Sequence, residues 1–235
     1  MANDPTSQPS PSQEAFFQAL AEQKKKDPLA GVKFGARELL HRFLEAFKDN
    51  RGVHVETLLT ALGALAGYAC QAALREMFIV TGKATEQTLF TVIEGDGQKY
   101  FLGDSLNHLL GGYEYSVWSV AAAGAQQAGC AKLPDMGELL KHVTATLCTP
   151  QFGNPRIPEK HRPRDQPIVL LQALWPKVLP LLRQFCDDPR QWPLMISLAI
   201  QNLLSTAPRT VIDPCLAVQI VMECAIPMSR ANVTH

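Results

Sequence analysis

The sequence carries no excess charge of either sign, because 22 lysines and arginines balance 22 aspartates and glutamates over 235 residues. Proteins that bind nucleic acids usually have a basic excess, since neutralising phosphates supplies much of their affinity. The balance therefore argues against a nucleic-acid partner. Neither G-x-x-x-x-G-K-[ST] nor G-x-G-x-x-G occurs, so no phosphate-binding loop indicates a nucleotide. We expect no cofactor.

Closely spaced cysteine pairs are also missing. None of the six cysteines stands in a C-x-x-C motif, so their spacing indicates neither a zinc site nor a redox dithiol. Most lie in apolar runs, where cysteine behaves as a small hydrophobic residue. We therefore expect no metal, and the reduced thiols of a cytoplasmic protein. The six are Cys70, Cys130, Cys148, Cys186, Cys215 and Cys224.

No long run of leucine, isoleucine and phenylalanine is present. The uncharged stretch "TLLTALGALAGYACQAAL", residues 57–74, is about as long as one bilayer span. It is rich in small residues, however, and Glu56 and Arg75 flank it without the basic excess that orients a membrane helix. We expect a buried helix at about residues 54–80 and no membrane insertion.

The N-terminal residues 1–11 contain neither the basic segment nor the apolar segment of a secretory signal. They are rich in serine and proline, a composition that buries too little apolar surface to fold. We expect a disordered leader here. Residues 12–235 are then expected to form a single domain.

The alternation of strands and helices that builds a parallel sheet is absent, whereas helical patterns recur along the chain. We predict a mainly α-helical, multi-helix bundle. Two of its helices are rich in alanine and glycine, and we expect these two, at about 54–80 and 115–127, to pack against each other. The other predicted helices are at about 12–26, 35–49, 168–186, 189–205 and 214–226.

Prolines set the limits of the C-terminal helices. Asp188-Pro189 and Asp213-Pro214 each combine an N-cap residue with a proline at the first helical position, which predicts a helix start. Pro176 and Pro180 lie within the predicted helix 168–186, where proline removes a backbone hydrogen bond. We expect them to kink or split that helix.

One β-hairpin is predicted at about residues 87–102. The segments "QTLFTVIE" and "QKYFL" flank Gly95–Gly97, a turn with Asp-Gly or Gly-Asp at its centre. The first segment shows little polar alternation, so both faces should meet apolar groups. Because a lone two-stranded hairpin is marginally stable, it should dock on helices or pair with a second copy. We therefore expect a homodimer.

The four residues after the hairpin are Gly103, Asp104, Ser105 and Leu106. This block resembles the first block of the GDSL-type serine esterases, and the resemblance implies a nucleophilic Ser105. The family's Gly-x-Asn-Asp and late Asp-x-x-His blocks do not occur here, and a serine needs a base and an oxyanion hole to react. His108 could share a helix face with Ser105. We expect Asp104 to cap a helix, with Ser105 and His108 as the alternative, catalytic pair.

A proline-rich loop spans residues 149–167. Five prolines in this segment exclude a helix or a central strand. Basic side chains on a stiff, extended segment bind carboxylates and phosphates. We expect either a surface linker or a site for an anionic small molecule or an acidic protein partner. The basic residues of that candidate site are Arg156, Lys160, His161, Arg162 and Arg164.

The sequence therefore favours a non-catalytic binding or interaction module. The alternatives are a small, esterase-like hydrolase that uses Ser105 and His108, and a protein that holds an apolar small molecule between its small-residue helices. Whether the protein is an enzyme stays open at this point.

Overall fold

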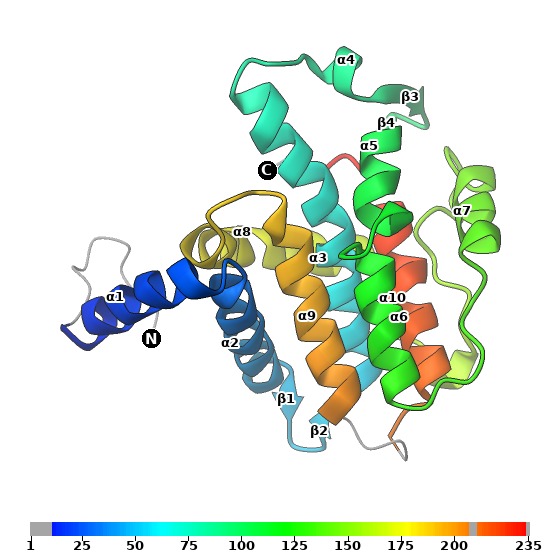
Figure 1. The fold of residues 1–235 in the computed structure, drawn as a ribbon. Helices are drawn as coiled ribbons and strands as arrows, with labels where there is room; N and C mark the ends of the chain where they lie inside the picture. The colour runs from blue at the N-terminus through cyan, green and yellow to red at the C-terminus, as the bar shows by residue number, and fades with distance from the viewer. Residues whose placement is uncertain (1–10, 207–210, 234–235) are drawn as a thin grey trace.

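The computed structural model describes residues 11–206 and 211–233. It confirms the mainly α-helical fold with a small β-hairpin (Figure 1). Apart from Pro11, where the first helix begins, the expected leader lies outside the described residues. The α-helices are α1 (Pro11–Lys26), α2 (Ala30–Ala46), α3 (Val55–Leu74), α4 (Glu86–Leu89), α5 (Asp104–Asn107), α6 (Val117–Gln127), α7 (Met136–Ala145), α8 (Pro167–Phe185), α9 (Gln191–Thr206) and α10 (Pro214–Met228). The short π- and 3-10 helices are η1 (Arg75–Val80), η2 (His108–Gly112) and η3 (Glu159–His161).

Helix α3 is the centre of the bundle and packs against α8, α9 and α10. Figure 1 shows α9, α3, α6 and α10 running side by side. Within the described residues, one helix, Val55–Val80, is long and apolar enough to span a membrane, and 94% of its most apolar stretch is buried inside the protein. A helix that is apolar on all sides is typical of a core position. The buried helix expected at residues 54–80 is confirmed for Val55–Leu74, and residues 75–80 continue it as η1 but are not buried.

Glycines in α3 bring it into backbone contact with α10. A Cβ atom on Gly63 would lie 2.5 Å from the carbonyl oxygen of Val221, and one on Gly67 would overlap the carbonyl oxygen of Ala225. The sequence predicted that α3 packs against the small-residue helix α6, and this prediction was wrong. Gly124 of α6 lies instead against Gln201 of α9, because small residues favour close approach without specifying which helix approaches.

Some helix boundaries match the expected ones and others do not. Asp213 caps α10 as predicted, since its carboxylate accepts hydrogen bonds from the N–H groups of Cys215 and Leu216. Asp188 instead binds the N–H of Arg190, 2.9 Å away, so α9 begins at Gln191. At the start of the chain, α2 begins five residues before the expected Gly35.

Helix α8 is not split at its prolines, so of the two expected outcomes, a kink or a split, the split was wrong. It runs unbroken from Pro167 to Phe185 with Pro176 and Pro180 inside it. These two residues are one turn apart and both are exposed, so the carbonyl groups that lose a partner face water. Trp175, Val178 and the other buried residues of the helix keep its opposite face in the core.

The hairpin pairs β3 (Thr91–Gly95) with β4 (Gln98–Leu102) in antiparallel register. Asp96 and Gly97 form the turn, and both have positive φ, 51° and 70°, as the two central residues of a type I′ turn require. The preceding residues 87–89, expected in the first strand, form the helical turn α4 instead. A second, very short pair, β1 (Lys48–Asp49) with β2 (Gly52–Val53), joins α2 to α3.

Both faces of the hairpin meet aromatic rings, as expected from its sequence. Phe101 packs against Phe90 on one face, with ring centroids 5.6 Å apart. Tyr100 packs edge-on against Phe152 on the other face at 4.8 Å. The C-terminal segment then adds to β4, because the N–H of Phe101 donates to the carbonyl of Arg230 at 2.9 Å. The hairpin is therefore docked on the helical body.

Two of the six cysteines form a disulfide, so the expectation of reduced thiols was wrong for this pair. Cys130 lies just beyond α6 and Cys215 in the first turn of α10, and their sulfur atoms are bonded across 85 residues of sequence. Disulfides persist in oxidising compartments and are rare in the cytoplasm. The cytoplasmic location therefore stays a prediction, against which this bond weighs.

Replacing Gly67 by alanine should test the contact between α3 and α10. Helix propensity alone would make the variant about 1 kcal/mol more stable. We expect the opposite sign, a loss of about 1–3 kcal/mol in the free energy of unfolding, because the added methyl group overlaps the Ala225 carbonyl. Urea unfolding measures the difference. A stabilised Gly67→Ala protein would contradict the packing described here.

Removing the disulfide should destabilise the protein. We expect Cys130→Ser to lower the free energy of unfolding by about 2–4 kcal/mol, because the cross-link restricts the unfolded chain. Thermal unfolding with and without a thiol reductant measures the effect. Cys148→Ser, which changes a partly exposed free cysteine, is the control and should leave the melting temperature nearly unchanged. Six reactive thiols in the denatured, unreduced protein would rule the bond out.

Candidate functional site

Residues 149–166 of the proline-rich loop form a strap that lies across the surface of the bundle. The strap contains one short turn of helix, η3, and otherwise has no regular secondary structure. It is held to the helical body by three pairs of basic and acidic side chains, Arg156 with Glu223, His161 with Glu56, and Arg164 with Asp49.

The first anchor is a buried carboxylate. Glu223 is the one acidic residue of α10, and its side chain is only 2% exposed. Its Oε1 accepts a hydrogen bond from Nε of Arg156 at 2.9 Å. Gln219, one turn earlier in α10, donates from Nε2 to the carbonyl of Arg156 at 2.9 Å. A buried carboxylate needs a partner of opposite charge, so this contact fixes the strap on α10.

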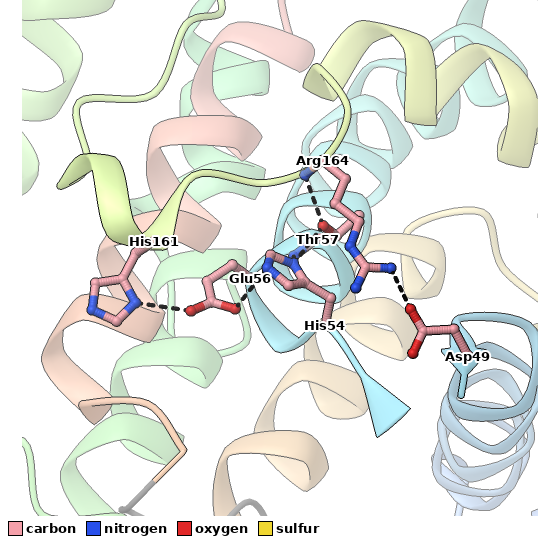
Figure 2. A network of polar contacts seen from close by, with 6 residues as sticks. All are labelled: Asp49, His54, Glu56, Thr57, His161 and Arg164. Carbon is pink, nitrogen blue, oxygen red and sulfur yellow. Dashed lines mark hydrogen bonds and ion pairs between the residues drawn. The ribbon is translucent and has the colours of Figure 1, made fainter. Parts of the chain in front are cut away.

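The second anchor is at the start of α3 (Figure 2). Nδ1 of His161 lies 2.8 Å from Oε1 of Glu56, and Nε2 of His54 lies 3.6 Å from the other carboxylate oxygen. His54 is the N-cap of α3, and its Nδ1 accepts from the N–H of Thr57. The neutral ring then carries its proton on Nε2, which faces Glu56. Two histidines therefore flank one carboxylate.

The third anchor adds the end of the strap to the same corner of the fold. The Arg164 guanidinium binds Asp49 of β1 at 2.8 Å, and the Arg164 N–H donates to Oγ1 of Thr57 at 2.9 Å (Figure 2). The pKa of Asp49 is lowered, first by the hydrogen bond from the N–H of Arg51 and then by that from Arg164. The charged carboxylate is thus favoured, so this anchor is present at neutral pH and is lost only in acid.

Three of the five basic residues expected to form an anion site already have acidic partners, and the anion site itself stays a prediction. Arg156, His161 and Arg164 already meet carboxylates of the helical body. Lys160 and Arg162 are exposed, and the nearest carboxylate oxygen of Glu159 lies 3.8 Å from Arg162. Three of the five basic side chains therefore help to hold the strap in place.

A cavity of about 190 Å³ opens beside the strap, where it meets β4, the start of α8 and the segment after α10. Five of its lining residues carry side-chain amides, and Tyr100 and Phe152 supply aromatic rings. Lys99 is the one charged lining residue. Amide groups both donate and accept hydrogen bonds, so the cavity matches an uncharged polar ligand. The amides are those of Gln98, Asn154, Gln166, Gln172 and Asn232.

A wider recess of about 440 Å³ continues from this cavity along the strap. Asn154, Gln166 and Pro167 line both spaces. Arg162 and Arg164, two of the five basic residues singled out from the sequence, belong to the walls of the recess. The cavity and the recess together form one groove, which we call the strap groove.

The alternative catalytic pair is exposed and unconnected. Ser105 lies in the first turn of α5 and His108 at the start of η2. His108 stacks on the ring of Tyr113, with centroids 5.0 Å apart and planes inclined by 16°. No side-chain hydrogen bond joins Ser105 to His108 within the described part of the chain. Asp104 does not cap this helix as expected. The N-cap residue is Gly103, and no side chain caps the first turn of the helix.

Several residues of the site carried no signal in the sequence. Glu56 and Glu223 stand in apolar helices, 105 and 67 residues from their partners on the strap. The amides of the cavity are common surface residues scattered over the chain. Within residues 11–206 and 211–233, no group of three or more histidine, cysteine, aspartate and glutamate side chains is placed to hold a metal ion.

Breaking the buried anchor should loosen the strap. We expect Arg156→Met to lower the free energy of unfolding by about 1–3 kcal/mol, because the buried Glu223 carboxylate loses its charged partner. Arg42→Met is the control, since it breaks an exposed pair with Glu38 and should cost less than about 0.5 kcal/mol. Urea unfolding gives both values, and trypsin cleavage after Lys160 reports strap opening. Equal effects of the two variants would contradict the role assigned to Glu223.

Comparison with known proteins gives no guide to the function of this site. No protein-family model, no curated protein and no solved structure matches this chain. Its function is therefore inferred from the strap and the groove themselves.

Proposed function

We propose that the protein is a non-catalytic binding module that holds an extended, uncharged segment of a partner polypeptide in the strap groove. The observation that carries this proposal is that five of the residues that line one small cavity carry side-chain amides. A peptide group offers an N–H donor and a C=O acceptor, and each side-chain amide offers an NH₂ donor and a C=O acceptor. A peptide backbone can therefore satisfy the lining of the cavity without bringing a charge into it.

The size of the groove supports a segment of chain over a compact cofactor. Cavities that enclose a whole drug-sized ligand typically measure about 300–1,000 Å³, and this one measures about 190 Å³. It suits a single anchoring side chain. The recess of about 440 Å³ continues from it, so neighbouring residues of the same ligand have a place to lie.

The polar rim fits the same picture. Interfaces often combine a buried anchor with a polar rim open to solvent. Here Tyr100 and Phe152 form the aromatic part of the cavity wall, and Arg162, Arg164 and Asp165 line the recess outside it. The acidic partner expected from the sequence finds less support, because the nearby Arg164 already binds Asp49.

The anchors of the strap prepare the groove for binding. Ordering a loop at the moment of binding costs affinity, whereas a loop fixed in advance avoids that cost. The strap is fixed by Glu223, Glu56 and Asp49 before any ligand arrives. The function of the three anchors is, on this proposal, to hold one wall of the groove in its binding shape.

A library of random linear dodecapeptides displayed on phage can test the proposal. We expect enriched peptides that lack charge at their central positions. The double variant Gln166→Leu/Gln172→Leu should bind them at least about tenfold more weakly, because two hydrogen-bonding amides are lost from the cavity wall. Isothermal titration calorimetry with the synthetic peptide measures the change.

A matched control is available on the same helix. Gln184 of α8 is exposed like Gln172 but lies outside the strap groove. Gln184→Leu should therefore bind the selected peptides with wild-type affinity. Equal binding by the double variant, or equal loss in the control, would refute the strap groove as the binding site.

A further inference from the structure

The two edges of the β-hairpin differ in whether their outward backbone groups have hydrogen-bond partners. On the outer edge of β4, the N–H of Phe101 donates to the carbonyl of Arg230, and Tyr100 pairs with Ala231. On the outer edge of β3, no backbone partner occurs within the described residues. One edge is therefore covered by the protein's own C-terminal segment, and the other is open.

The register shows which groups the open edge offers. In an antiparallel pair of strands, opposite residues alternate along the strands. The backbone groups of one pair bond to each other, and those of the next pair point outward, away from the partner strand. The backbone N–H of Phe101 points away from β3, toward Arg230. The backbone groups of its partner Val92 therefore point away from β4, at the opposite edge of the hairpin. The same alternation applies two residues on, to Glu94. The N–H and C=O groups of Val92 and Glu94 are thus directed outward from β3.

We propose that β3 pairs antiparallel with β3 of a second copy of this chain, around a two-fold axis at Ile93. Val92 of each copy then lies opposite Glu94 of the other, and their outward groups form four hydrogen bonds. The two hairpins become one four-stranded sheet. This interface uses the hairpin alone and does not depend on the peptide site proposed for the strap groove.

The neighbouring registers are less favourable. An axis at Glu94 would place two carboxylates directly opposite each other, which is destabilising. An axis at Val92 would require the N–H of Phe90, which already donates to the carbonyl of Glu86 at 2.9 Å. With the axis at Ile93, each Glu94 faces an uncharged side chain and keeps its own ion pair with Lys99, 3.1 Å away.

The covered edge explains why the second copy completes the assembly. An exposed strand edge can recruit chain after chain, but the outer edge of β4 is occupied by Arg230 and Ala231. Pairing through β3 is isologous and leaves the outer edge of each β4 beside its own C-terminal segment, so it closes at two copies. Figure 1 shows the hairpin at one end of the molecule, away from α1 and α2.

A cysteine placed on the proposed axis tests the register. In a Cys148→Ser background, Ile93→Cys should form a disulfide-linked dimer on mild oxidation, because opposite residues that face away from each other have Cα atoms about 4.5 Å apart. Thr91→Cys is the control. Its two copies would be offset by four residues, about 14 Å along the strands, and should stay unlinked on a non-reducing gel. Cross-linking of the control in place of Ile93→Cys would overturn the register.

Light scattering tests the assembly itself. We expect the wild-type protein to have twice the chain mass of 25.8 kDa. Glu94→Pro removes an outward N–H without removing a bond to β4 and should give a monomer with an unchanged circular dichroism spectrum. Glu94→Gln keeps the N–H and should remain a dimer. A monomeric wild-type protein, or a Glu94→Pro variant that is folded and still dimeric, would overturn the proposal.

Discussion

The contact between the backbones of α3 and α10 is the constraint on which the rest of the structure depends. At Gly63 and Gly67, a single added carbon atom would overlap carbonyl groups of α10. Protein interiors are packed so densely that such an overlap displaces whole elements. The two glycines therefore set the position of α10, and α10 carries parts of every feature that follows.

Three features of the fold begin on α10. At its start, Cys215 is bonded to Cys130, beyond the end of α6. In its middle, Glu223 holds the strap. After its end, the chain adds to the outer edge of β4. There, the guanidinium of the buried Arg230 donates a hydrogen bond to Oγ1 of Thr144, in the last turn of α7, at 3.1 Å. Burial lowers the pKa of this guanidinium. A cation beside a helix C-terminus is favoured by the helix dipole.

Local chemistry made parts of this fold predictable, and long-range chemistry did not. Asp213 caps α10 as its sequence indicates, because an N-cap bond spans only two or three residues. The pairing of Cys130 with Cys215 cannot be derived from spacing, since six cysteines allow many connectivities. The basic residues of the strap were recognised, but their partners Glu56 and Glu223 were not. Solitary acidic residues in apolar helices indicate burial without naming the cation that compensates them.

The strap groove exists only where segments distant in sequence meet. Its cavity is lined by Tyr100 of the hairpin, Phe152 of the strap, Gln172 of α8 and Met228 of α10. Each of these segments is held in place by a different contact. A ligand that binds only the assembled groove must in turn stabilise all of these contacts together. The polar anchors and the glycine contact thus act on one equilibrium, between the assembled groove and its separated walls.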